Sequence, residues 1–332
     1  MMENSSIYAN LSEYQMSYTA YLGTGIYVAF VGILSTFGNL IVIVVICGKR
    51  KEINFQKKQH IPLLLNLAVA DIGVSLFGYP YTSLSGMAGR WLFTDELCTM
   101  AAFFCFLLSL VSLSSLVVVS IIRYIVICKP GLKPRLTSRM INYTVLLTWL
   151  YGVAWAVIPL FGPAAYTYEM FGTSCSINWT RGLLQDTIFI ICIDVFCFLI
   201  PLAIIATCYV QIILRYRMIS APSTTGYDNS DGFTKMKARR DMRVTWLVLV
   251  QVGSFITVWT PYVVVSGLSL VYSLPVWVTV LPTMFAKLSC AVNPITYSLL
   301  NRTFRRMSRD ILCKCALRKV SHSSDKYRPT NR

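Results

Sequence analysis

The sequence predicts an all-α membrane protein, a bundle of seven transmembrane helices followed by a short amphipathic helix. The chain is 55% hydrophobic and only 13% charged, which is not the composition of a soluble protein. Its apolar residues gather in repeated runs of about 18 or more, long enough to cross a bilayer as helices. Runs of this length, separated by short polar stretches, favour a helical bundle over a β-barrel.

Seven such runs follow one another along the 332 residues. The expected spans are about Gly23–Cys47, His60–Leu84, Cys98–Ile127, Met140–Phe161, Asp186–Leu214, Val244–Tyr272 and Val276–Leu300. This divides the chain into an N-terminal tail (1–22), a transmembrane domain (23–300) and an amphipathic helix with a C-terminal tail (301–332).

The basic residues indicate the orientation of the bundle. Of the 30 Lys and Arg residues, all except Arg90, Arg181 and Lys287 fall on one side of the predicted membrane. The positive-inside rule makes that side cytoplasmic, so the N-terminus is extracellular and the C-terminus cytoplasmic, as in a multi-pass plasma-membrane protein. The net charge of +16 therefore indicates orientation and contact with anionic lipid, and no nucleic-acid partner is expected.

The outer segments contain sites of covalent modification. The N-terminal tail lacks the basic and apolar regions of a cleavable signal peptide. Asn4, Asn10 and Asn178 begin glycosylation sequons on the outer side, although such triplets also occur by chance. Cys98 and Cys175 both face the oxidising side, where a disulfide between them would persist.

The seventh span has a single charge, Lys287, near mid-membrane depth. Such a charge costs roughly 2.5–3.5 kcal/mol on insertion scales, so it needs either a structural ion pair or a function. Desolvation makes a lysine amine nucleophilic toward aldehydes, the usual basis of a Schiff base.

Six residues after Lys287 the chain reads NPITY, with Asn293, Pro294 and Tyr297. A lysine at this distance from an NPxxY motif resembles the seventh helix of the opsins, rhodopsin-like G-protein-coupled receptors. The segments ILSTFGN, FGTSC and LPTMFAK look most like the neuropsin branch. The resemblance implies covalent retinal at Lys287 and a light-sensing receptor that activates a heterotrimeric G protein, with receptor kinase and arrestin as further partners, and no enzyme activity.

The resemblance also assigns residues in the first three spans. Asp71 is expected at the centre of a polar network, around a sodium ion in one interpretation, that draws on Asn39, Ser112, Ser289 and Asn293. The third span ends Ile122-Arg123, where the family usually has an acid before the arginine. Arg123 is then left with Asp241 as its expected partner, and some activity in the dark is a hypothesis.

The counterion of a protonated Schiff base is assigned to the second outer loop. Glu169, six residues before Cys175, matches the loop glutamate of many opsins, whereas the other usual position is the neutral Ala101. Asp194 in the fifth span is the alternative. Many neuropsins have a lysine in the outer second span, which this chain lacks at Gly78-Tyr79-Pro80.

Later elements complete the expected site and switch. Trp259 and Tyr262 flank the hinge proline of the sixth span and are expected to line the retinal pocket. Arg123 and Tyr209 would line the cytoplasmic cleft that opens for the G protein. Cys313 and Cys315 follow the basic amphipathic stretch and are palmitoylation candidates.

Three other functions compete with this one. A retinal photoisomerase of the same family is the first, and a same-fold receptor for a diffusible ligand, with Lys287 in a structural ion pair, is the second. A transporter is disfavoured, because no interrupted helices recur in two related halves.

Overall fold

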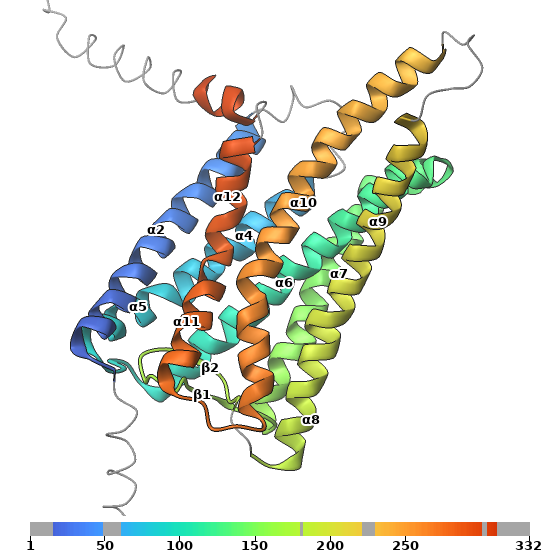
Figure 1. The fold of residues 1–332 in the computed structure, drawn as a ribbon. Helices are drawn as coiled ribbons and strands as arrows, with labels where there is room; N and C mark the ends of the chain where they lie inside the picture. Colours follow the sequence, from blue (N-terminus) through green and yellow to red (C-terminus); the bar gives the residue numbers. More distant parts are fainter. Residues whose placement is uncertain (1–15, 49–60, 180–181, 221–229, 301–303, 311–332) are drawn as a thin grey trace, which may run out of the picture.

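The computed structural model describes residues 16–48, 61–179, 182–220, 230–300 and 304–310. Over these residues the chain is a bundle of long helices with one small hairpin at the lower end of Figure 1. Six helical stretches are long and apolar enough to cross a membrane, and α11 together with α12 forms a seventh that is bent by 42°. The predicted seven-helix membrane fold is confirmed.

The helices follow the predicted order. The first four spans are α2 (Tyr18–Gly48), α4 (Ile61–Phe77) continued by α5 (Tyr79–Ala88), α6 (Asp95–Cys128), and α7 (Ser138–Val157) with a 3-10 turn (Ile158–Phe161). The fifth is α8 (Leu184–Cys192), a π-helix (Ile193–Leu199) and α9 (Ile200–Ser220). The last are α10 (Ser230–Ser269), α11 (Val276–Lys287) and α12 (Ser289–Leu300), and residues 304–310 form a short helix.

The ends of two spans differ from the prediction for identifiable reasons. α6 begins at Asp95 rather than Cys98 because Thr94 caps it, accepting a hydrogen bond from the Leu97 N–H at 3.3 Å. α10 begins at Ser230, well before the predicted Val244. Hydropathy marks only the part of a helix that lies in lipid, so a polar extension into water escapes it.

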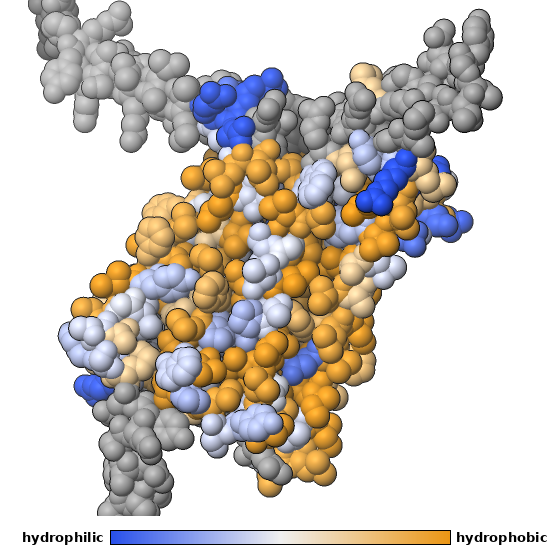
Figure 2. Space-filling view, in the orientation of Figure 1, coloured by the Kyte–Doolittle hydropathy of each residue, from blue (hydrophilic) through white to orange (hydrophobic). Residues whose placement is uncertain are grey.

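The bundle is apolar both inside and on its flank. Val28, Ala70 and Val111 pack in a fully buried cluster, while large apolar side chains such as Phe30 and Leu147 are about 60% exposed (63% and 60%). Figure 2 shows apolar side chains over much of the face in view, with the most hydrophilic residues mainly toward the upper end. An exposed apolar belt of this extent fits a surface that faces lipid.

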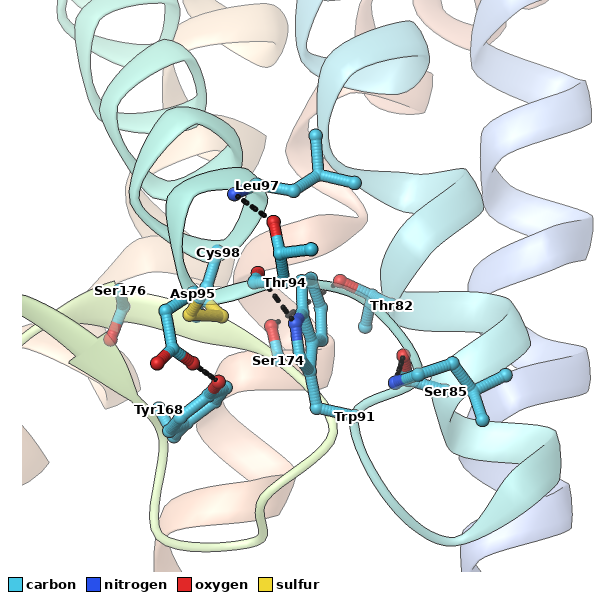
Figure 3. Close-up of a disulfide and its surroundings, with 12 residues drawn as sticks. Thr82, Ser85, Trp91, Thr94, Asp95, Leu97, Cys98, Tyr168, Ser174 and Ser176 are labelled. Carbon is cyan, nitrogen blue, oxygen red and sulfur yellow. Dashed lines mark hydrogen bonds between the residues drawn. A yellow bond between two sulfur atoms is a disulfide. The ribbon is translucent and has the colours of Figure 1, made fainter.

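A hairpin lies against the lower end of the bundle in Figure 1. β1 (Tyr166–Tyr168) pairs antiparallel with β2 (Cys175–Ile177), with Tyr168 opposite Cys175. The predicted disulfide joins Cys175 to Cys98 at the start of α6, with a Cα–Cα distance of 5.5 Å, and Tyr168 donates a hydrogen bond to Asp95 beside it (Figure 3). The hairpin is therefore fixed to the first turn of α6 by one covalent and one polar contact.

The seventh span is not the continuous helix that the apolar run 276–300 predicts. α11 ends at Lys287 and α12 starts at Ser289, so the chain bends at Leu288. Hydropathy carries no information about this break, because the residues on both sides of it are apolar. The charged residue that the sequence singles out is thus the last residue of α11.

Candidate functional site

Lys287 points from the end of α11 toward the hairpin. Its Nζ donates a hydrogen bond to Ser174 Oγ at 3.2 Å, and it lies 5.9 Å from the ring centroid of Tyr79. Among the residues that the structure describes, no carboxylate forms an ion pair with this ammonium; its one hydrogen-bond partner is a neutral hydroxyl. The alternative role of Lys287, a structural ion pair, is therefore not observed within that part of the chain.

Glu169 lies in the turn of the hairpin, next to the partner of Lys287. Its N–H donates to Ser174 O at 2.8 Å, and its carbonyl accepts from Gly172 N at 2.7 Å. Gly172 has a φ of 69°, a left-handed conformation that favours glycine, so the turn that presents Glu169 depends on this residue. The loop glutamate and the intramembrane lysine therefore meet at the same small segment.

The carboxyl of Glu169 is held in a low-polarity environment. Burial raises the pKa of this carboxyl, and the nearby charge of Lys287 acts in the opposite direction, as do the hydroxyls of Ser176 and Ser174. Its Oε2 atom is buried and has no hydrogen-bond partner among the described residues. A buried acceptor without a donor is costly, and it marks a place where another polar group fits.

A cavity extends from Lys287 across the bundle. It holds about 1020 Å³ of empty space, counting the part that is open to the outside, and its walls are mainly apolar. Lys287, Glu169, Asp194, Trp259 and Tyr262 all line it, so every residue predicted for the retinal site faces one space. A mostly apolar cavity with a few converging polar groups is the usual form of a small-molecule site.

The two predicted acids differ in their relation to Lys287. Glu169 shares a turn with Ser174, the residue that Lys287 contacts. Asp194 lies in the π-helix of the fifth span, and its carboxylate faces α10, where a Cβ placed on Gly267 would lie 3.8 Å from Oδ2. Glu169 is thus the acid joined to the lysine through a neighbour, while Asp194 belongs to the opposite wall.

Aromatic side chains line the cavity at the hinge of α10. The rings of Phe255 and Trp259 stack at 5.8 Å, and Tyr262 meets Trp259 edge-on at 5.8 Å. Tyr262 Oη accepts a hydrogen bond from Trp179 Nε1 at 2.7 Å, which ties the hinge region to the loop after β2. Trp259 Nε1 is buried with no partner among the described residues, a second polar atom at this cavity that is left unpaired.

A separate polar network lies in the middle of the bundle. Asp71 accepts hydrogen bonds from Ser112 Oγ at 2.8 Å and from Asn293 Nδ2 at 2.6 Å. Gln251 Nε2 donates to Asn293 Oδ1 at 2.6 Å, and Tyr297 Oη donates to Gln251 Oε1 at 3.2 Å. Four helices, α4, α6, α10 and α12, are joined by this chain of contacts.

Two residues predicted for this network are less directly involved. Asn39 donates to the carbonyls of Cys290 and Ser35, and Ser289 approaches Cys290 Sγ at 3.9 Å; neither is hydrogen-bonded to Asp71. No group of three or more His, Cys, Asp or Glu side chains that could hold a metal ion occurs in the described ranges. The sodium interpretation, which combines Asp71 with serine and asparagine side chains, remains a prediction.

The structure describes only some of the residues predicted to form the cytoplasmic switch. Ile122 is 3% exposed, in keeping with an apolar residue where the family has an acid, and Tyr209 is also 3% exposed near Arg123. The side chain of Asp241 lies outside the described residues, as do Asn4, Asn10, Cys313 and Cys315. The expected contact between Arg123 and Asp241 therefore stays a prediction.

Sequence reasoning missed three residues. Ser174 contacts Lys287, Tyr79 donates to its backbone carbonyl at 2.5 Å, and Gln251 bridges Asn293 and Tyr297. Gln251 could have been recognised from the sequence, since it is a polar residue inside the apolar run of the sixth span. Tyr79 and Ser174 carried none, because tyrosine and serine are common in helices and loops.

Known proteins resemble this chain over most of its length. Residues 38–297 match the 7 transmembrane receptor (rhodopsin family). "Rhodopsin, G0-coupled" from Mizuhopecten yessoensis is 32% identical over 305 residues, covering 90% of this chain and 74% of that protein. "Opsin-5" from Homo sapiens is 31% identical and covers 87% and 81%. The crystal structure of squid rhodopsin superposes with a TM-score of 0.79 at 26% identity, covering 88% of this chain and 85% of that one.

Proposed function

We propose that this chain binds retinal covalently at Lys287 and signals through a heterotrimeric G protein. The chain belongs to the rhodopsin family of seven-transmembrane receptors and, within that family, to the opsins. Its relatives are light-sensing receptors of that class, and coupling to a G protein is a property of the family. What is specific to the proposal is the assignment of roles to residues of this chain.

The observation that carries the proposal is the environment of Lys287. Its amine opens into a mainly apolar cavity and is held by one serine hydroxyl. An amine that lines an apolar cavity is placed to condense with an aldehyde bound there. Retinal supplies the aldehyde and the absorption of light.

The residues of the cavity suit such a group. Its walls offer apolar and aromatic surface for a polyene, while Glu169 Oε2 and Trp259 Nε1 are buried polar atoms without protein partners in the described part of the chain. Glu169 is the proposed counterion, because its turn also holds Ser174 against Lys287. Asp194, on the wall formed with α10, is the alternative.

The route from the cavity to the G protein runs along α10. Trp259 and Tyr262 touch the cavity on both sides of Pro261, which removes one helix hydrogen bond and permits bending there. A displacement at this point moves the inner part of α10 relative to Arg123 and Tyr209. We propose that the cleft so exposed receives the G protein, with the N-terminus of the chain outside the cell and the C-terminus in the cytoplasm.

The test uses the purified chain incubated with 11-cis or all-trans retinal. Absorption is recorded in the dark, after illumination and after acid denaturation, for the wild type, Lys287→Ala and the control Lys129→Ala, which changes an exposed lysine. A light-sensitive band and an acid-trapped adduct should form in the wild type and in the control but not in Lys287→Ala. The absence of any pigment with either isomer would overturn the proposal in favour of a diffusible ligand.

A further inference from the structure

The break in the seventh span leaves backbone carbonyls without their usual helical donors. In a regular helix the N–H of Ala291 would bond to the carbonyl of Lys287, but here it donates to Leu288 O at 3.0 Å. The N–H of Leu288, which would serve Met284, donates instead to Phe285 O at 3.0 Å. Pro294 has no N–H to offer Cys290.

Side chains of the first two spans supply the missing donors. Tyr27 Oη donates to Met284 O at 3.0 Å, Tyr79 Oη to Lys287 O at 2.5 Å, and Asn39 Nδ2 to Cys290 O at 3.0 Å. The three acceptors are three residues apart, so they lie on one side of the bent span, the side that faces α2 and α5. In a membrane, where no water can bond to these carbonyls, such donors determine whether the break is tolerated.

Tyr79 occupies the central position because the second span is itself interrupted. Gly78 separates α4 from α5, and a Cβ at this position would lie 2.2 Å from Cys105 Sγ and 3.2 Å from Val74 O, so a larger residue would force Cys105 to move. The ring of Tyr79 then lies against Gly32 of α2, where an added Cβ would be 3.3 Å away. The side chain is 3% exposed, which leaves its ring little freedom to move.

We propose that Tyr79 is a positioning residue for Lys287: by holding the backbone carbonyl of Lys287 at the junction of two broken helices, it fixes where the lysine nitrogen stands relative to Ser174 and Glu169. The hydroxyl acts on the backbone of Lys287, while the ring stands 5.9 Å from its Nζ. The spectral part of this proposal rests on the proposed function; the part concerning the backbone does not.

The test compares two variants that delete the same kind of bond. Tyr79→Phe keeps the ring and removes the donor to Lys287 O; the matched control Tyr27→Phe removes the donor to Met284 O, about one turn from the break. With retinal bound, Tyr79→Phe should shift the absorption maximum and react about fivefold faster with hydroxylamine in the dark, the factor that corresponds to a hydrogen bond of ~1 kcal/mol. Tyr27→Phe, which acts on the carbonyl of Met284 rather than on that of Lys287, should change both quantities much less. Equal behaviour of the two variants would overturn the proposal.

A second measurement needs no retinal. Hydrogen–deuterium exchange of the ligand-free protein should be faster in the segment 287–292 of Tyr79→Phe than in that of Tyr27→Phe, since the former loosens the break itself. Equal exchange in the two variants would overturn the positioning role of Tyr79, whether or not a pigment formed. Faster exchange in Tyr79→Phe without any pigment would support the positioning role and reject only the proposed function.

A further variant applies if Tyr79→Phe does not fold. Gly32→Ala retains the hydroxyl but presses a methyl group against the ring. It should change the absorption maximum and the exchange of segment 287–292, and wild-type values for both would contradict the positioning role.

Discussion

The cavity at Lys287 and the network at Asp71 are both polar regions in an apolar bundle, yet their hydrogen bonding differs. At the cavity, Lys287 has one serine as its partner, and Glu169 Oε2 and Trp259 Nε1 have none among the described residues. Around Asp71 the polar groups are joined at 2.6–3.2 Å. Satisfied buried groups stabilise one arrangement of the helices, whereas unsatisfied ones indicate where a ligand completes the structure.

The largest effect is expected at the cavity, from Lys287→Arg. A guanidinium keeps the positive charge but does not condense with an aldehyde, so pigment formation and light-dependent nucleotide exchange should be lost completely. Absorption after incubation with retinal, together with nucleotide exchange on the G protein, measures this. Residual light-dependent activity would show that the charge of Lys287, rather than its nucleophilicity, is what the site needs.

The next effect concerns the choice between the two acids of the cavity. Glu169→Gln should move the pigment at neutral pH from visible to ultraviolet absorption, because the negative charge near Lys287 is lost. Asp194→Asn should change the spectrum much less, since its carboxylate faces α10. A pH titration of absorption for both variants decides the matter; the reverse ranking would assign the counterion to Asp194.

In the inner network, Gln251→Leu should be destabilising rather than inactivating. It leaves Asn293 Oδ1 and Tyr297 Oη without their partners, at a cost of about 1–3 kcal/mol in unfolding free energy. Because Gln251 joins α10 to α12 through Asn293 and Tyr297, this loss should also raise nucleotide exchange in the dark. Thermal unfolding and dark exchange measure the two effects, with the exposed Gln211→Leu as the control. An unchanged dark rate would mean that Gln251 serves stability alone.

The smallest effect is the pH dependence that Glu169 gives to the ligand-free protein. Burial raises the pKa of this carboxyl above its ordinary value of 4.5, so the folded state holds its proton more tightly than the unfolded state does. The stability contributed by Glu169 is therefore fully present below pH 4.5 and is lost as the pH rises through the raised pKa of the folded state. The loss amounts to about 1.4 kcal/mol for each unit by which the folded-state pKa exceeds the unfolded-state pKa. The unfolding free energy of the wild type, minus that of Glu169→Gln, should therefore fall as the pH rises over this interval. A rise would contradict the expected pH dependence.

The sequence predicted the parts of the molecule that composition and motif spacing control. The seven spans, the placement of Lys287 and Glu169 at one cavity, and the contact of Asn293 with Asp71 follow from long apolar runs and from the opsin resemblance. The break at Leu288 was not predictable, because it depends on donors contributed by Tyr27, Tyr79 and Asn39 from other helices. Such contacts exist only once the helices are packed.

Pro261 divides α10 into two arms of unequal length. At 1.5 Å per residue, the arm toward Ser269 is about 12 Å long and the arm toward Ser230 about 45 Å. For a rigid long arm pivoting at Pro261 the ratio of the two arms is about four, so a shift of about 1 Å at the Ser269 end corresponds to about 4 Å at the Ser230 end. Shortening the long arm would reduce the displacement at the Ser230 end without altering the cavity.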